Sequence, residues 1–167
     1  MKNIVLIGMP GCGKTTIGKR LARRLDREFI DMDCSIEEDV GMSVSDIFEM
    51  QGEEAFRRLE TEKAQELSSM SGIIISTGGG AVTRDENMRC LKENGMVFFI
   101  ERRIDKIVDT SDMSVRPLLQ EDGANTLKKL YDKRIDIYRK FADYIVTNNG
   151  EQYVAVEKIM KVAQGNV

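Results

Sequence analysis

The segment that most constrains the fold of this chain is residues 4–25. Ile4–Ile7 is an unbroken apolar run, which is typical of a strand buried on both faces. Residues 8–15 read GMPGCGKT and match a pattern of a glycine, four further residues and then Gly-Lys-Thr. Apolar side chains then recur every four residues, so an amphipathic helix is expected over about residues 14–25. A strand, a glycine-rich turn and a helix in this order predict a phosphate-binding loop.

The residues of this loop have expected roles in binding a nucleotide. Its glycines let backbone N–H groups turn toward phosphate oxygens, and the helix N-terminus adds positive potential. Lys14 is expected to reach the terminal phosphates, and the Thr15 hydroxyl to ligate Mg²⁺. Cys12 is either a redox-sensitive thiol or a small residue that fills the loop, and the second role is the commoner one. The nucleotide-binding residues predicted from the loop are Gly11, Cys12, Gly13, Lys14, Thr15 and Thr16.

The remainder of the chain alternates short apolar runs with segments of helical period. This alternation predicts an α/β fold, a three-layer α/β/α sandwich around a five-stranded parallel sheet. Capping-box spacing marks helix starts at Ser35 and Thr83. A length of 167 residues favours a single domain over 1–167. Strands are also expected at 29–30, 73–75, 97–100 and 144–146, and helices at about 52–69, at 124–141 and near the C-terminus.

Composition excludes several classes of function. The sequence has no histidine, which excludes Ser-His-Asp and Cys-His catalysis and His-ligated zinc. Its three cysteines are widely spaced and form no Cys-x-x-Cys pair, so we expect a cytoplasmic protein without disulfides. A net charge of −3 argues against a nucleic-acid-binding protein. No apolar run approaches the ~20 residues of a membrane span, so no membrane segment is expected.

Two aspartates follow the second predicted strand and suggest an acceptor site. If Asp31 and Asp33 lie in extended chain, both side chains face the carboxyl edge of the sheet. Carboxylates beside a phosphate loop suit magnesium coordination and acceptance of a proton from an alcohol. A surface turn or a helix cap is the alternative interpretation of the pair.

Arginines and glycines extend this site. Arg57 and Arg58 are adjacent on a predicted helix, about 100° apart, so only one of them can face a given ligand. Gly78–Gly80 follow the third strand and would expose backbone N–H groups to an anionic or hydroxylated ligand, although a tight turn is the alternative. Arg116, held by the following proline in the polar segment 110–123, suits a lid over phosphates; a surface arginine is the alternative.

In their order and spacing, these motifs together resemble the shikimate kinase family over nearly the whole chain. The resemblance implies a P-loop kinase fold with a mobile lid at about 110–123 and a shikimate-binding helical region at about 33–61. It also implies a monomer that transfers the γ-phosphoryl group of ATP to the 3-hydroxyl of shikimate with Mg²⁺, on the route to chorismate and aromatic amino acids. The motifs are the phosphate loop, Asp31-x-Asp33, Ile47-Phe48 before Gly52-Glu53, Phe56-Arg57-x-x-Glu60, Gly78-Gly79-Gly80, Arg116-Pro117-Leu118-Leu119, and Arg134 with Tyr138 before Ala142-Asp143.

The resemblance also implies a role for each matching residue. Asp33 would contact the hydroxyls of shikimate and take the proton, and Asp31 would lie near the magnesium ion. The catalytic residues implied are Asp33, Lys14 and Arg116, the last two as ligands of the γ-phosphate; Arg116 thereby joins the nucleotide-binding set. The implied substrate-binding residues are Asp33, Arg57, Gly78, Gly79, Gly80 and Arg134, and the implied metal ligands are Thr15 and Asp31.

Three positions depart from the family pattern. Asp109 stands where the family commonly has an arginine against the adenine, residues 148–150 lack a basic residue, and Asp136 replaces a proline. The first two departures predict a weaker affinity for ATP. The rival interpretations are another small-molecule kinase, such as a gluconate kinase, and a nucleotide-binding regulator without turnover. A gluconate kinase would share the phosphate loop but not the triple glycine together with Arg57 and Arg134.

Overall fold

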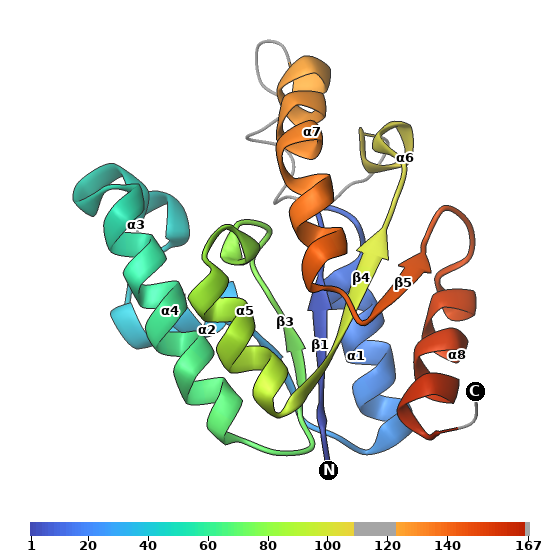
Figure 1. Ribbon diagram of the computed structural model, residues 1–167. Helices are drawn as coiled ribbons and strands as arrows, with labels where there is room; N and C mark the ends of the chain where they lie inside the picture. The colour runs from blue at the N-terminus through green and yellow to red at the C-terminus, as the bar shows by residue number, and fades with distance from the viewer. Residues whose placement is uncertain (109–122, 166–167) are drawn as a thin grey trace.

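The computed structural model describes residues 1–108 and 123–165. It contains one sheet of five strands, all parallel, in the order β2-β3-β1-β4-β5 (Figure 1). The strand that leads into the phosphate loop is therefore the central one. The strands are β1 (Asn3–Ile7), β2 (Phe29–Asp31), β3 (Ile74–Ser76), β4 (Gly95–Glu101) and β5 (Tyr144–Thr147).

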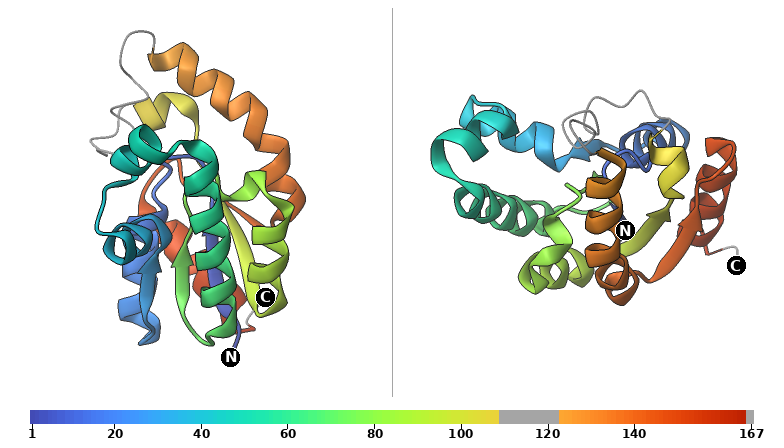
Figure 2. Two further views of the ribbon diagram at one scale, coloured as in Figure 1. Left: turned by 90° about the vertical axis from the view of Figure 1, so that its left-hand side faces the viewer. Right: turned by 90° about the horizontal axis from the view of Figure 1, so that it is seen from above.

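Helices cover both faces of this sheet. α1 packs against α8 on one face, whereas α4, α5 and the end of α7 lie on the other (Figure 2). This confirms the predicted three-layer α/β/α sandwich with its five-stranded parallel sheet. The helices are α1 (Lys14–Leu25), α2 (Met32–Val40), α3 (Val44–Gln51), α4 (Glu53–Ser69), the 3-10 turn η1 (Ala81–Thr83), α5 (Asp85–Glu93), α6 (Ile104–Val108), α7 (Gly123–Phe141) and α8 (Gln152–Ala163).

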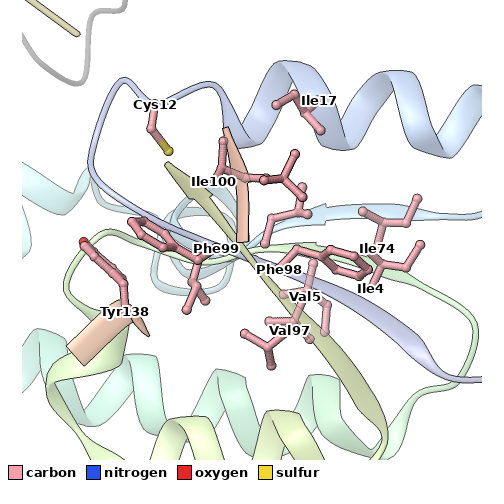
Figure 3. Close-up of a cluster of buried hydrophobic side chains, with 14 of the residues drawn as sticks. Ile4, Val5, Cys12, Ile17, Ile74, Val97, Phe98, Phe99, Ile100 and Tyr138 are labelled. Atoms are coloured by element: carbon pink, nitrogen blue, oxygen red, sulfur yellow. The ribbon is translucent and has the colours of Figure 1, made fainter. Parts of the chain in front are cut away.

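The sheet's core explains why β1 is so apolar. Every side chain of Ile4–Ile7 is fully buried, as parallel strands covered on both faces require (Figure 3). Phe99 of β4 stacks on Tyr138 of α7 with ring centroids 5.1 Å apart, so α7 is anchored to the sheet by an aromatic pair. Cys12 is also fully buried at this core, which favours its role as a packing residue.

The parallel register places the carboxyl ends of all five strands at one edge. Leu6 pairs with Ser76 and Ile7 with Phe99, so the segments after β1, β3 and β4 leave the sheet together. In Figure 1, α7 descends onto the sheet from this same edge. Ligands of open α/β sheets bind at such an edge, so residues from distant segments can meet here.

Of the two helix starts predicted from capping-box spacing, the one at Ser35 is wrong, whereas α5 begins at Asp85, within two residues of Thr83. α2 begins at Met32, three residues before Ser35, because the Asp31 carboxylate accepts a bond from the Cys34 amide and caps the helix. Ser35 therefore lies inside α2. Thr83 belongs to η1, because its hydroxyl donates to the carbonyl of Gly80 at 2.7 Å instead of capping α5.

Most other predicted element bounds are confirmed within one or two residues. α3 was not predicted as a separate helix. The predicted lid at 110–123 and its Arg116 lie outside the described residues, apart from Gly123, which begins α7. Within 1–108 and 123–165, no helix combines the length and the apolar character that crossing a membrane requires.

Candidate active site

Residues 8–15, named here the phosphate loop, connect β1 to α1 in a conformation that needs glycine. Gly8 and Gly13 have φ angles of 148° and 104°, values that side chains with a Cβ rarely adopt. Space is equally restrictive. A Cβ on Gly8 would lie 2.7 Å from the carbonyl oxygen of Ile100, and one on Gly13 would lie 2.6 Å from the amide nitrogen of Asn148. The loop is thus packed tightly against the ends of β4 and β5.

Side-chain donors bind several carbonyl oxygens of the phosphate loop. The ammonium of Lys14 donates to the carbonyls of Gly8 and Met9, at 2.8 and 2.9 Å. The side-chain amide of Asn148 donates to the carbonyl of Cys12 at 2.8 Å. With carbonyls engaged in this way, the loop can present backbone N–H groups and a buried positive charge to an anion.

Thr15 and Asp31 meet beside the phosphate loop. The Thr15 hydroxyl donates to Oδ2 of Asp31 at 2.8 Å, which joins the start of α1 to the end of β2. Both groups offer exposed oxygen atoms, and Mg²⁺ prefers oxygen ligands while keeping water and phosphate in its shell. No group of three or more His, Cys, Asp or Glu side chains within the described ranges could hold a metal. The pair therefore fits an ion held largely by nucleotide phosphates. Thr16, the next residue of α1, is exposed.

Asp33 lies in the first turn of α2 and not in the extended chain that the sequence suggested. Its Oδ1 is buried and has no hydrogen-bond partner among the described residues. Burial, reinforced by the negative charges of Glu60 and Asp31, raises the pKa of Asp33 to about 6, although Lys14 acts in the opposite direction. A carboxyl group with a pKa near neutrality is suited to exchanging a proton.

Gly78–Gly80 leave room for charged side chains to approach the backbone. A Cβ on Gly78 would lie 2.6 Å from Oδ1 of Asp33 and 2.9 Å from Oε1 of Glu60. One on Gly80 would collide with the guanidinium of Arg57. These glycines were expected to serve as backbone donors. Their close contacts supply a second reason for the triple glycine, because a side chain would displace two acids at Gly78, Pro10 at Gly79 and Arg57 at Gly80.

Arg57 is the inward-facing member of the arginine pair. Its side chain is only 11% exposed and pairs with Glu60 at 2.5 Å and with Glu53 at 3.2 Å. Its guanidinium also lies 5.6 Å from the ring centroid of Phe56, within cation–π range. Arg58 is exposed, as the angular separation of the two residues predicted. Aromatic and carboxylate contacts thus hold the guanidinium against the Gly80 backbone.

Glu60 was part of a sequence motif but was not predicted as a site residue. Its side chain is 1% exposed, and its Oε1 has no partner within the described part of the chain. Burial raises the pKa of Glu60, while Arg57 acts against that shift. The available signal was the spacing of three residues from Arg57, which places the two side chains on one helix face.

Arg134 and Tyr138 of α7 contact the glycine segment at Gly79. A guanidinium nitrogen of Arg134 lies 3.3 Å from the position of a Cβ on Gly79. The Tyr138 hydroxyl donates to the Gly79 carbonyl at 2.6 Å, and burial raises the pKa of this phenol. We name the group of predicted and newly found residues around the glycines the acceptor cluster: Asp33, Arg57, Glu60, Gly78, Gly79, Gly80 and Arg134.

Comparison with known proteins identifies the family of the chain. The family model described as shikimate kinase matches residues 10–164. A shikimate kinase of Clostridium botulinum (strain Eklund 17B / Type B) is 46% identical over 167 residues, covering 99% of this chain and 100% of the relative.

Two solved structures share the fold over almost the whole chain. Shikimate kinase from Acinetobacter baumannii in complex with shikimate has a TM-score of 0.92 at 37% identity and covers 99% of this chain and 94% of that one. Shikimate kinase from Aquifex aeolicus has a TM-score of 0.82 at 34% identity, covering 98% and 97% of the two chains.

Proposed function

Because the chain belongs to the shikimate kinase family, we propose that it transfers the γ-phosphoryl group of ATP to the 3-hydroxyl of shikimate, giving shikimate 3-phosphate and ADP. The reaction needs positioning and charge neutralisation more than covalent catalysis, which suits a chain without histidine. The observation that carries the proposal is the buried Asp33 oxygen, which has no partner among residues 1–108 and 123–165, lies beside Gly78 and shares the acceptor cluster with two arginines.

In this proposal, the acceptor cluster binds shikimate through its carboxylate and its hydroxyls. Arg57 and Arg134 grip the carboxylate, because the planar guanidinium forms paired bonds with it. Gly78, Gly79 and Gly80 supply backbone donors. Asp33 accepts the proton of the attacking 3-hydroxyl as the new oxygen–phosphorus bond forms, and a pKa of about 6 leaves it ionised at neutral pH.

The phosphate loop binds ATP in the same proposal. The backbone of residues 11–16 surrounds the phosphates, while Lys14 and Arg116 neutralise the γ-phosphate as its bond to ADP breaks. Thr15 and Asp31 would hold Mg²⁺, and that ion supplies charge neutralisation on the phosphate oxygens. Lys14 must leave the carbonyls of Gly8 and Met9, or share its donors with them, to reach a phosphate.

A coupled assay of ADP release tests the function. Shikimate should stimulate ADP release, whereas gluconate should leave it at the background rate. Phosphorus NMR of the product should show one phosphomonoester. If gluconate stimulated release and shikimate did not, the chain would be a different small-molecule kinase. If neither stimulated release although ADP still bound, a nucleotide-binding regulator would be the better interpretation.

We also propose that residues 1–167 act as one cytoplasmic, monomeric domain that binds no nucleic acid, with a lid at about 110–123 that closes over ATP and excludes water. Light scattering on a sizing column tests the monomer. Limited proteolysis tests the lid, because MgATP should protect the bonds around Arg116. Equal cleavage with and without nucleotide would contradict closure.

A further inference from the structure

Asn148 connects the end of β5 to the phosphate loop, although 136 residues separate it from the residue it contacts. Its side chain is almost completely buried, at 3% exposed. The amide Nδ2 donates to the carbonyl of Cys12 at 2.8 Å, and the backbone N–H of Asn148 donates to the carbonyl of Glu101 at 2.8 Å. The backbone of Asn148 is therefore bonded to β4, while its side chain is bonded to the phosphate loop.

The orientation of this amide follows from its partner. A carbonyl oxygen only accepts hydrogen bonds, so the amide must present its N–H₂ group to Cys12. Its Oδ1 is then left buried without a partner in the described ranges. A buried acceptor without a hydrogen bond is energetically unfavourable. We therefore take the bond from Nδ2 to the phosphate loop as the main interaction of this side chain.

The contact also has a directional consequence for the neighbouring peptide. In a planar trans peptide the carbonyl and the following N–H point to opposite sides. When Asn148 holds the Cys12 carbonyl, the N–H of Gly13 is directed away from Asn148. Gly13 itself lies so close to the amide that a Cβ would be 2.6 Å from Nδ2, so Asn148 packs directly against the residue whose N–H it directs.

We propose that Asn148 is a positioning residue of the nucleotide site, which orients the Cys12–Gly13 peptide so that the Gly13 N–H faces the bound phosphates. It acts through the phosphate loop and does not itself touch the reacting groups. The inference rests on the part of the proposed function that assigns nucleotide binding to this loop. It is independent of the identity of the acceptor.

Binding of MgADP, measured by calorimetry without turnover, tests the proposal. Asn148→Ala removes the donor, so we expect the dissociation constant for MgADP to rise about 5- to 10-fold. Asn148→Asp has nearly the same shape but sets an acceptor against the Cys12 carbonyl, so its loss of affinity should be larger still. The dissociation constant for shikimate should stay within about two-fold of wild type in both variants, since neither change touches the acceptor cluster.

Asn3→Ala is the matched control. Asn3 is also a buried asparagine, 1% exposed, whose amide donates to a loop carbonyl, that of Met70, at 2.9 Å. It lies at the start of β1, at the opposite end of the strand from the phosphate loop. Asn3→Ala should lower the unfolding temperature and leave MgADP affinity unchanged.

The outcomes separate the alternatives. If Asn148→Asp bound MgADP as tightly as wild type, or if Asn3→Ala lost affinity to the same extent, Asn148 would have no positioning role. Stability would then account for any effect. Wild-type protein that bound MgADP but did not phosphorylate shikimate would contradict the proposed function and leave the role of Asn148 intact.

Discussion

The phosphate loop and the acceptor cluster are constructed in different ways. The phosphate loop is a local structure, because one strand, one turn and one helix of continuous sequence form it, and positive φ angles at Gly8 and Gly13 set its shape. The acceptor cluster takes its residues from α2, α4, α7 and the segment after β3. Charges and close contacts set its shape, since buried Glu60, half-buried Asp33 and two arginines converge on three glycines.

This difference determines what each region tolerates. The phosphate loop depends on backbone conformation, so it is sensitive to a Cβ at its glycines and to the loss of hydrogen bonds to its carbonyl groups. A cluster that depends on buried charge is sensitive to protonation and to the loss of one partner of a pair. Substitutions should therefore affect the two substrates separately, and the following predictions test that separation in order of decreasing effect.

Asp33→Asn should have the largest effect. The amide cannot accept a proton from the substrate, so kcat should fall about 1,000-fold, in the range of a lost general base. Stability should change in the opposite direction, because wild-type Asp33 is a half-buried acid next to the negative charges of Glu60 and Asp31. Coupled kinetics and thermal unfolding measure the two effects. A variant with a tenth of wild-type kcat would remove Asp33 from the catalytic role.

Two glycine substitutions compare the regions directly. Gly80→Ala places a methyl group against the Arg57 guanidinium and should raise the KM for shikimate about 10- to 100-fold, the cost of overpacking a tight site. The Gly80 backbone is helical at φ −95°, so alanine adds no conformational strain there. Gly13→Ala should instead raise the KM for ATP by a similar factor, because its φ is 104° and its methyl group meets Asn148.

Steady-state kinetics with each substrate varied in turn would measure both KM values. Gly80→Ala should raise only the KM for shikimate, and Gly13→Ala only the KM for ATP. The unfolding temperature of both variants serves as the control for misfolding. If Gly80→Ala changed both KM values equally, the two regions would be coupled and not separate.

The pKa of Asp33 predicts a pH dependence that belongs to the acceptor cluster. With a pKa of about 6, the base becomes protonated as pH falls, so kcat/KM for shikimate should decline below about pH 6. Any pH dependence of MgADP affinity, which the ionisation of its own phosphate can produce, should be the same in wild type and in Asp33→Asn. The residual kcat/KM of Asp33→Asn should not show this decline below about pH 6.

Protonation of Asp33 should affect stability in the opposite direction to activity: it should lower kcat/KM but raise the free energy of unfolding. A folded-state pKa raised above the unfolded value of 3.8 means that protonation favours the fold. The contribution is complete below about pH 4 and is lost as pH rises through 6; a shift of this size corresponds to about 2–3 kcal/mol at most. Chemical unfolding from pH 4 to 7 should show the slope in wild type and a shallower one in Asp33→Asn.

The contrast between the regions also explains what the sequence predicted well. The phosphate loop is local, so its pattern, its flanking strand and its helix were all evident from residues 4–25. Helical geometry predicted that only one of Arg57 and Arg58 faces the site, and the family resemblance indicated that it is Arg57. The start of α2 was missed because the Asp31 carboxylate, assigned to a ligand, caps the helix as well.

Long-range contacts explain the other omissions. The spacing of three residues predicts that Glu60 lies beside Arg57, but the burial of Glu60 also requires Gly78 opposite it, a contact between distant segments. Asn148 is a similar case. Its contact with Cys12 exists only because β5 lies next to β4, whose end borders the loop.

Tyr138→Phe should have the smallest effect and tests the boundary between the two regions. The hydroxyl donates to the Gly79 carbonyl at 2.6 Å and lies 3.9 Å from the sulfur of Met9 in the phosphate loop. Its removal should cost about 1 kcal/mol of unfolding free energy, the net value of one buried hydrogen bond. Because the ring still stacks on Phe99, the main loss should be local to Gly79.

A KM for shikimate that rises about two- to five-fold, with the KM for ATP unchanged, is therefore expected. Equal changes in both KM values would mean that Tyr138 transmits strain from the acceptor cluster into the phosphate loop through Met9. The phosphate loop and the acceptor cluster would then be coupled through Tyr138, and α7 would be the element that connects them.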